Sequence, residues 1–260
     1  MFEIFKLRVL NLFRVSCSEF RVWIADVVPL GFIALPFSCM VAICAGEEPA
    51  ALRQDFENRL PGLTPEGWGK AWGGQLLDDI FTTSNTEALS GKQSLLLERR
   101  PYAKPIQYGL ARLTPPINAT AAKLVIPFLL KGPTAYGASF SIELRLPKTN
   151  VGVAWIVVAG GKAVIRKVKK PADLGGIEFG VWHRFVVILP LEADKGKSGS
   201  AILERRQKDG SWTPCGDSAD VDVLFSIMPG RKLEIQLIPG VTGEFQLFID
   251  DLSVEPASVL

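Results

Sequence analysis

Short runs rich in Val and Ile follow one another along most of this chain, separated by Gly, Pro, Asn or Asp. In residues 139–146 and 232–237 apolar and polar residues alternate, as a half-buried strand requires. Asp209-Gly210 and Pro229-Gly230 are tight-turn signals between such runs. This pattern is typical of an antiparallel sandwich or barrel. It predicts strands near residues 94–98, 107–113, 123–130, 139–146, 151–158, 163–168, 182–189, 200–206, 221–228, 232–238 and 244–254.

The size of the chain fits one such domain behind a leader. The 260 residues are 48% hydrophobic and 22% charged, which is a globular composition. Residues 46–260 are enough for a single all-β domain with its own core. Of four cysteines only Cys215 lies there, so the domain holds no internal disulfide. We therefore predict an all-β, antiparallel jelly-roll β-sandwich of about 11–13 strands over 46–260, preceded by an N-terminal signal or anchor helix in 1–45.

The first 45 residues have the pattern of an export signal. Four basic residues lie within 1–21, residues 27–46 carry no charge, and Glu47-Glu48-Pro49 follow. A basic flank before an apolar run that ends in small residues is typical of a secretory signal, here with cleavage after Ala45. The run of 20 residues is also long enough to remain as a membrane anchor, and a lipid-modified Cys44 is a third alternative. In each case we expect residues 46–260 to be secreted or held in the cell envelope, in the periplasm or at the surface.

Charge and residue usage argue against several classes of function. Residues 46–260 carry 25 Lys and Arg against 24 Asp and Glu, whereas a nucleic-acid binder shows a basic excess or stripe. His183 is the only histidine, which excludes a multi-histidine metal centre, and we interpret it as a surface strand residue. Asp78-Asp79 and Asp250-Asp251 are neighbours in sequence, and neighbours on a strand point to opposite faces. We therefore expect no enzymatic activity.

Short motifs near the start and near the end of the segment 50–256 are those of a known family. Near the start are Asp55-Phe56-Glu57, Gly67-Trp68 and Ser90–Leu95, and near the end is Phe248–Val254. This frame resembles the jelly-roll carbohydrate-binding modules. Gly180–Val187 is similar to a strand of the concanavalin A-like (laminin G-like) sandwiches. The motifs are moderately specific for the fold and weakly specific for a ligand.

The resemblance implies a structural calcium ion that joins the first and last strands. It would be bound by Glu57 and Asp250, with Lys92 and Asp251 nearby supplying backbone or side-chain oxygen. Ca²⁺ takes six to eight oxygen ligands, and carbonyl groups can complete the set. Asp250 shares its strand face with apolar neighbours, so its carboxylate needs a partner. Two alternatives stay open: backbone N–H groups bond to Asp250, or a bulge turns it to solvent.

A sugar site needs aromatic faces and planar polar groups. The candidates are Tyr102, Tyr108, Arg112, Arg145 and Trp155, of which Arg112 and Arg145 lie on strands that could share a sheet face. The first hypothesis is an exported, non-catalytic, lectin-like protein with a glycan as its partner. The second is a structural or protein-interaction domain of the cell envelope, with another envelope protein as its partner. The third is an unrecognised polysaccharide-active enzyme, and contact with a membrane is expected only through an uncleaved N-terminal segment.

Overall fold

The computed structural model describes eleven stretches of the chain, with only the backbone at 112–113. They are 52–68, 81–99, 112–113, 121–132, 138–145, 152–166, 168, 170–190, 198–222, 233–240 and 243–257. The chain divides into two compact units, Met1–Cys44 and Ala45–Leu260, and all described residues belong to the second. The predicted leader and its helix lie outside the described residues. Among the residues described, no helix is long and apolar enough to cross a membrane.

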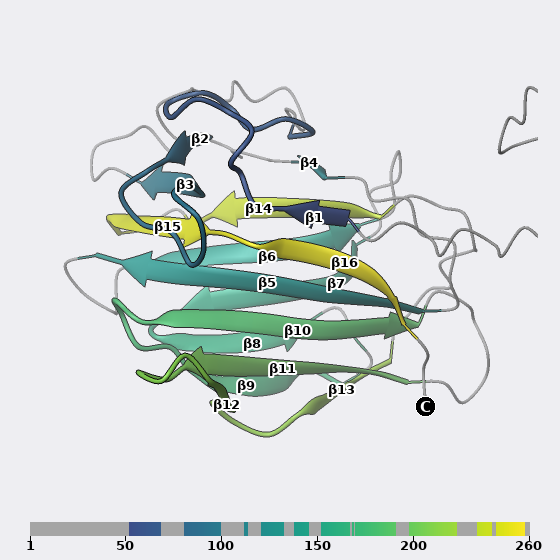
Figure 1. Ribbon diagram of the computed structural model, residues 1–260. Coiled ribbons are helices and arrows are strands. Elements are labelled where there is room, and N and C mark those ends of the chain that lie inside the picture. Colours follow the sequence, from purple (N-terminus) through teal and green to yellow (C-terminus); the bar gives the residue numbers. More distant parts are fainter. Residues whose placement is uncertain are drawn as a thin grey trace, which may run out of the picture. The chain divides into compact units, whose positions relative to one another are not determined.

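All regular structure in the described residues is β, and it forms two antiparallel sheets that face each other (Figure 1). The first sheet has the order β12-β11-β10-β5-β15-β3-β2. In addition, β16 pairs with β5, β1 pairs with β16, and β13 pairs with β11. Its strands are β1 (Leu52–Gln54), β2 (Phe81–Ser84), β3 (Ser94–Arg99), β5 (Ala121–Lys131), β10 (Trp182–Pro190), β11 (Gly199–Arg206), β12 (Trp212–Pro214), β13 (Ala219–Val221), β15 (Phe245–Ile249) and β16 (Leu252–Ala257).

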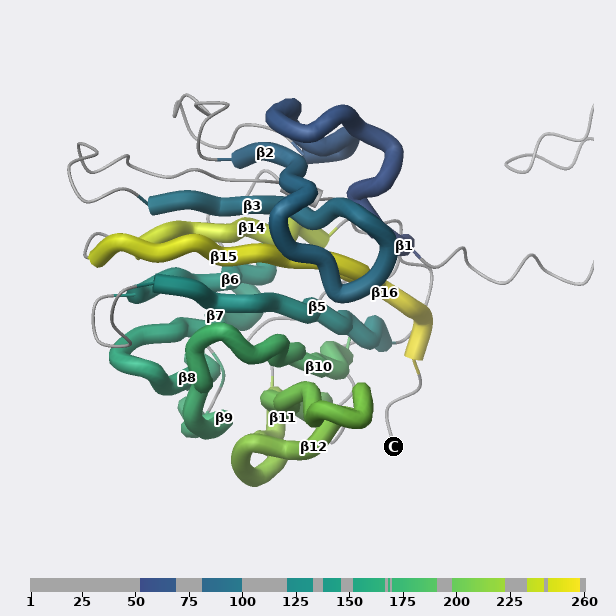
Figure 2. Tube along the Cα trace, turned by 60° about the vertical axis from the view of Figure 1, so that its left-hand side comes forward, coloured from purple at the N-terminus to yellow at the C-terminus, as the bar shows by residue number. Residues whose placement is uncertain are grey.

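The second sheet has the order β4-β14-β6-β7-β8-β9. Its strands are β4 (Arg112–Leu113), β6 (Ser139–Arg145), β7 (Gly152–Ala159), β8 (Lys162–Arg166), β9 (Ala172–Gly176) and β14 (Glu234–Pro239). Figure 2 shows β6, β7, β8 and β9 stacked as one layer beside β5, β10 and β11.

The core lies between the two sheets and is filled by alternate residues of each strand. Phe140, Ile142 and Leu144 of β6 belong to the same buried cluster as Ile126 and Phe128 of β5. The rings of Phe128 and Phe140 meet edge to face across the two sheets, with their centroids 5.6 Å apart. The alternation seen in residues 139–146 therefore decides which face of β6 is buried, as the sequence predicts.

The sandwich prediction is confirmed, with more strand segments than expected. The described residues contain 16 strands. The sequence did not predict β1, β2, β9 and β12. β13 meets the predicted strand at 221–228 only at Val221, and most of that predicted strand lies outside the described residues. The predicted strand at 244–254 is present as two segments, β15 and β16.

A bulge at Asp250-Asp251 separates β15 from β16. Both strands pair with β5, and Asp251 takes a left-handed backbone conformation with φ 47°. Because two residues lie between them, Ile249 and Leu252 both face the core. The bulge explains why this segment shows two apolar rows in the sequence, since the face of alternate residues changes at Asp250.

His183 is a core residue, and its interpretation as a surface strand residue is wrong. It follows the same inward alternation as Phe185, Val187 and Leu189, and its exposed fraction is 0%. Its ring stacks on Phe128 at 5.6 Å, Nδ1 lies 2.9 Å from the Val181 carbonyl oxygen, and the Glu178 N–H donates to Nε2. Burial lowers the pKa of His183 below its usual 6.5. The imidazole is thus a neutral, fully bonded part of the core.

Candidate functional site

Five residues in direct register cross the outer face of the second sheet. Arg112 pairs with Gln236, Gln236 with Glu143, Glu143 with Trp155, and Trp155 with Arg166. Their strand neighbours, such as Ile235, Ile142 and Ile165, face the core. Since successive residues of a strand point to opposite faces, these five positions form one row on the face away from the core. We call them the polar row.

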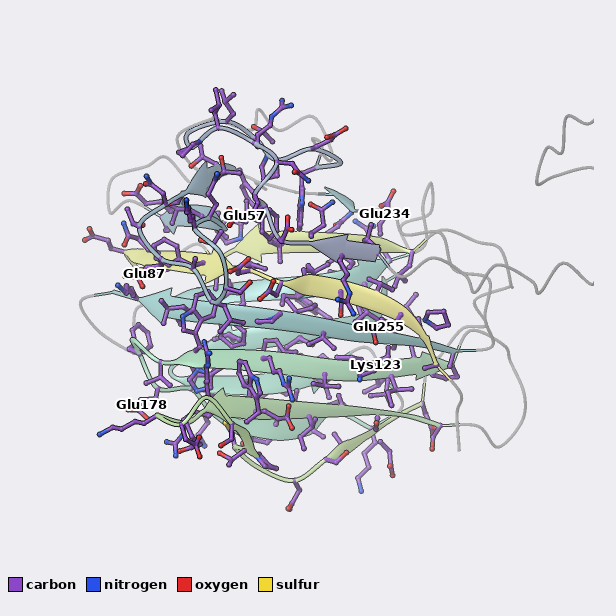
Figure 3. The ribbon with its side chains drawn as sticks, viewed as in Figure 1. Glu57, Glu87, Lys123, Glu178, Glu234 and Glu255 are labelled. Carbon is purple, nitrogen blue, oxygen red and sulfur yellow. The ribbon has the colours of Figure 1, made fainter. Side chains whose placement is uncertain are left out.

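Four residues of this face form a connected polar network: Glu143, Arg145, Glu234 and Gln236. Arg145 Nη1 donates to Gln236 Oε1 at 3.1 Å, and Gln236 Nε2 donates to Glu234 Oε2 at 3.4 Å. Arg145 Nε lies 3.8 Å from Glu143 Oε2. The Gln236 amide therefore links the Arg145 guanidinium to the Glu234 carboxylate. Figure 3 shows Glu234 at one end of β14.

The polar network is buried although it lies outside the core. Gln236 is 0% exposed, Glu234 6% and Glu143 7%. Burying charges costs free energy even when they are paired, and apolar residues would fill the same positions at lower cost. Natural proteins break this rule chiefly at functional or strained sites. This face is therefore the best candidate for a functional site among the described residues.

Exposure increases along the polar row toward β8. Gln236 and Glu143 are buried, Trp155 is half-buried and Arg166 is exposed. A ligand approaching from the side of β8 would meet Arg166 and the Trp155 ring first, and the network behind them. The row thus has an accessible end and a buried end.

A β-bulge lies beside the network, between β6 and β7. Leu144 pairs with Ala154 and Arg145 with Gly152, so Val153 is the extra residue on β7. Bulges change the direction of nearby side chains and are frequent next to functional sites. Here the irregularity falls on the position opposite Arg145, the residue that joins Glu143 to Gln236.

The structure brings three of the five predicted sugar-site residues onto this face. Arg145 and Trp155 lie there with their side chains described, and Arg112 lies there by its register. Tyr102 and Tyr108 lie outside the described residues. Glu143, Gln236, Glu234 and Arg166 were not among the predicted site residues. The alternation of residues 139–146 places Glu143 and Arg145 on one face, but only strand pairing brings Gln236 and Glu234 beside them.

The predicted calcium ligands gather elsewhere, around the loop between β2 and β3 (residues 85–93). Asp250 Oδ2 accepts hydrogen bonds from the N–H groups of Leu89 at 2.8 Å and Ser90 at 3.0 Å, and Oδ1 accepts one from Asp251 at 2.8 Å. Glu57 Oε1 accepts from the N–H groups of Lys92 and Gln93, both at 2.7 Å. The two carboxylates therefore hold the β2–β3 loop against the first sheet.

Further contacts tie the same loop down. The Ser90 hydroxyl donates to Asp251 Oδ1 at 2.9 Å, and Glu87 forms an ion pair with Lys131 of β5. Glu57 and Glu87 both lie at this loop (Figure 3). Gly91 has φ 61°, and a Cβ there would lie 2.5 Å from Glu57 Oε1. Only glycine therefore allows the loop to approach the Glu57 carboxylate this closely.

This arrangement does not fit a calcium ion at the bonded oxygens. Glu57 Oε1 and both Asp250 oxygens face N–H groups, whose partial positive charge repels a cation. In the part of the chain that the structure describes, no three His, Cys, Asp or Glu side chains gather closely enough to hold a metal. Backbone N–H groups bonded to Asp250 were one of the alternatives left open by the sequence. Calcium binding stays a prediction. If the protein binds the ion, its melting temperature should be higher with Ca²⁺ than with EDTA.

Three of the solved structures similar to this chain are a sialidase, an alginate lyase and a lectin. A sialidase matches 81% of this chain with a TM-score of 0.50 and 10% identity, and the chain spans 19% of the sialidase's length. A PL-14 alginate lyase from Aplysia kurodai has a TM-score of 0.49 and 10% identity over 72% of this chain and 89% of its own. The lectin UEA-II, complexed with galactose, has a TM-score of 0.48 and 12% identity over 80% of this chain and 98% of its own.

The likeness to the sialidase agrees with a distant jelly-roll or concanavalin A-like sandwich, as the sequence motifs indicate. No protein-family model and no curated protein matches the sequence.

Proposed function

We propose that this protein is an exported, non-catalytic glycan-binding protein, and that the polar row on the second sheet is its binding face. The observation that carries the proposal is the buried network of Glu143, Arg145, Glu234 and Gln236 beside the half-buried Trp155. The similar structures support a glycan as the ligand, because their names describe proteins that bind or act on carbohydrates.

The chemistry of this face suits a sugar. A pyranose presents hydroxyl groups that donate and accept hydrogen bonds, and a face of C–H groups. The Arg145 guanidinium has donors only and the Glu143 carboxylate has acceptors only, and both side chains keep about a tenth of their surface exposed. The fully buried Gln236 amide holds the Arg145 guanidinium in place. Trp155 adds a large apolar surface with one polar N–H. Fixing these groups before a ligand arrives lowers the entropy cost of binding.

Two positive observations support a binding role over a catalytic one. His183 lies in the core with both ring nitrogens bonded, so it does not serve as an acid or base at the surface. The carboxylates of the network are also engaged, Glu143 with Arg145 and Glu234 with Gln236. Export is supported by the basic and apolar pattern of the first 46 residues.

A polysaccharide pull-down tests this proposal. The protein is mixed with insoluble plant, algal and bacterial polysaccharides, and the bound fraction and any released sugar are measured. We expect retention on at least one polysaccharide without release of sugar. Arg145→Lys keeps the charge but loses the planar fork of donors, and Trp155→Ala loses the ring, so each should weaken retention roughly tenfold.

Lys162→Ala is the matched control for this experiment. Lys162 lies on β8 of the same sheet, and its side chain is 70% exposed, so its loss should leave retention unchanged. Equal retention of Arg145→Lys, Trp155→Ala and the wild type would contradict binding at the polar row. Release of sugar would instead support a polysaccharide-active enzyme, and no retention on any polysaccharide would favour an envelope interaction domain.

A further inference from the structure

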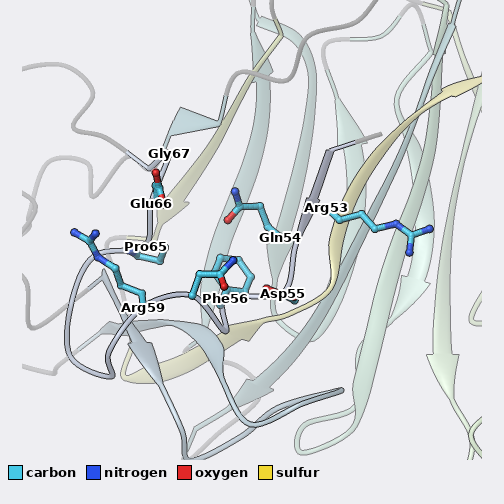
Figure 4. Close-up of a pocket in the computed structure, with 9 residues that line it drawn as sticks. Arg53, Gln54, Asp55, Phe56, Arg59, Pro65, Glu66 and Gly67 are labelled. Atoms are coloured by element: carbon cyan, nitrogen blue, oxygen red, sulfur yellow. The ribbon is translucent and has the colours of Figure 1, made fainter. Parts of the chain in front are cut away.

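A separate pocket lies where β1 leads into the segment 55–67. Its volume is about 280 Å³, close to the lower end of the range for small-ligand sites. Nine residues line it: Arg53, Gln54, Asp55, Phe56, Asn58, Arg59, Pro65, Glu66 and Gly67. None of them belongs to the polar row or to the polar network. Figure 4 shows Gln54 extending from β1 toward Phe56 and Pro65, with the Arg53 guanidinium directed away.

Phe56 and Pro65 give the pocket an apolar base. Both are buried, and the Phe56 ring packs against Trp68 with centroids 6.2 Å apart. Phe56 has φ 59°, which is uncommon for a bulky residue. The left-handed conformation places the ring inward while Glu57, next in the chain, reaches the β2–β3 loop. The base of the pocket is thus fixed by the same turn that holds this loop.

The polar lining holds more acid than base. Asp55 and Glu66 stand against Arg59, while the Arg53 guanidinium is directed away and lies 3.8 Å from Glu255. Gln54 and Asn58 each offer both donors and acceptors. A lining of this kind does not favour an anion. It suits an uncharged ligand that carries several hydroxyl groups and one apolar face.

We infer that this pocket binds one neutral sugar unit, such as the end of a glycan chain. The inference deepens the proposed function and rests on it, because it names a second contact point for the same class of ligand. Gln54 and Asn58 bond to hydroxyl groups, and the C–H face of the pyranose packs on Phe56 and Pro65. Because the pocket is small and its polar side chains are mostly exposed, affinity for a single sugar should be weak, in the millimolar range.

Saturation-transfer difference NMR with the full-length protein tests the inference. The probes are methyl β-D-glucopyranoside, methyl β-D-galactopyranoside and methyl α-D-mannopyranoside, with D-glucuronate as a charged comparison. We expect a signal from at least one neutral glycoside and no stronger signal from glucuronate. Asn58→Ala and Gln54→Ala should each weaken binding roughly fivefold, the effect of one lost hydrogen bond.

Arg145→Lys distinguishes this pocket from the polar row. If the pocket binds the sugar, Arg145→Lys leaves the glycoside signal unchanged while it weakens retention on polysaccharide. A glycoside signal that depends on Arg145 and not on Asn58 would overturn the pocket while it supports the polar row. Absence of any glycoside signal, with polysaccharide retention intact, would also overturn the pocket alone. Absence of both would contradict the proposed function.

Discussion

Replacing Asp250 with alanine should lower the free energy of unfolding by about 3–5 kcal/mol. The carboxylate is fully buried and accepts hydrogen bonds from the N–H groups of Leu89, Ser90 and Asp251. Asp250→Ala removes three hydrogen bonds to a buried carboxylate, and bonds to a charged group contribute about 1.5–3 kcal/mol each, from which the cost of burying the charge is subtracted. For a domain of this size the melting temperature should fall by roughly 10 °C. Chemical and thermal denaturation followed by circular dichroism measures both quantities.

The matched control is Asp251→Asn. Asp251 is the adjacent carboxylate, it is partly exposed, and Asn tolerates its left-handed backbone and still accepts from the Ser90 hydroxyl. Asp251→Asn should lower the free energy of unfolding by less than about 1 kcal/mol. Equal loss of stability in the two variants would show that Asp250 does not hold the β2–β3 loop in the way described.

The same carboxyl group should make stability depend on pH. Burial and the nearby Asp251 charge raise the pKa of Asp250 to about 6, above the ordinary value of 3.8 that the carboxyl group has in the unfolded chain. The folded state therefore binds the proton first, and this group adds stability as the pH falls from about 6 to 4. His183 acts in the opposite direction below pH 6.5, since burial lowers its pKa. The test is therefore to compare the free energy of unfolding of the wild type with that of Asp250→Asn. As the pH falls from 7 to 5, the wild type should gain stability relative to the variant.

Replacing Arg145 with methionine should lower the free energy of unfolding by about 3 kcal/mol. Its guanidinium bonds to Gln236 and lies beside Glu143, and its side chain is 11% exposed. Removing one partner of a buried charge pair leaves the other charge without compensation, which typically costs about 3–5 kcal/mol. The methionine keeps most of the apolar packing, so the loss reports on the polar contacts. Urea denaturation of the two proteins side by side measures it.

Arg166→Met is the control for this prediction. Arg166 lies on the same row but is exposed, and surface substitutions usually change stability by less than about 0.5 kcal/mol. If Arg145→Met were as stable as the wild type, the network would not be a buried, interacting unit. Nothing would then distinguish this face from ordinary protein surface.

The fold could be predicted from the sequence because it depends on local patterns. Phe140, Ile142 and Leu144 alternate with polar residues, and this alternation decides which face of β6 is buried. Short strands were missed where burial alternates over too few residues, as in β1 and β12. The two apolar rows around Asp250 were visible, but the bulge that reconciles them depends on pairing with β5, which is a distant contact.

The candidate site could be predicted only in part, for a similar reason. Arg112, Arg145 and Trp155 are residue types that a sugar site uses, and strand parity can place two of them on one face. Gln236 and Glu143 become neighbours only through the pairing of β14 with β6, which joins segments about ninety residues apart. His183 was misplaced because the sequence does not show which face of β10 is buried, since Trp182, Arg184 and Val186 on its other face are also partly buried.

Hydrogen–deuterium exchange of the protein with a polysaccharide that retains it tests whether the polar row binds the glycan. We expect slower exchange in β6, β7, β8 and β14 on binding, and no change in β10 and β11 of the opposite sheet. The protection should be lost in Arg145→Lys. Protection confined to β10 and β11, or binding that leaves the second sheet unchanged, would contradict glycan recognition by the polar row.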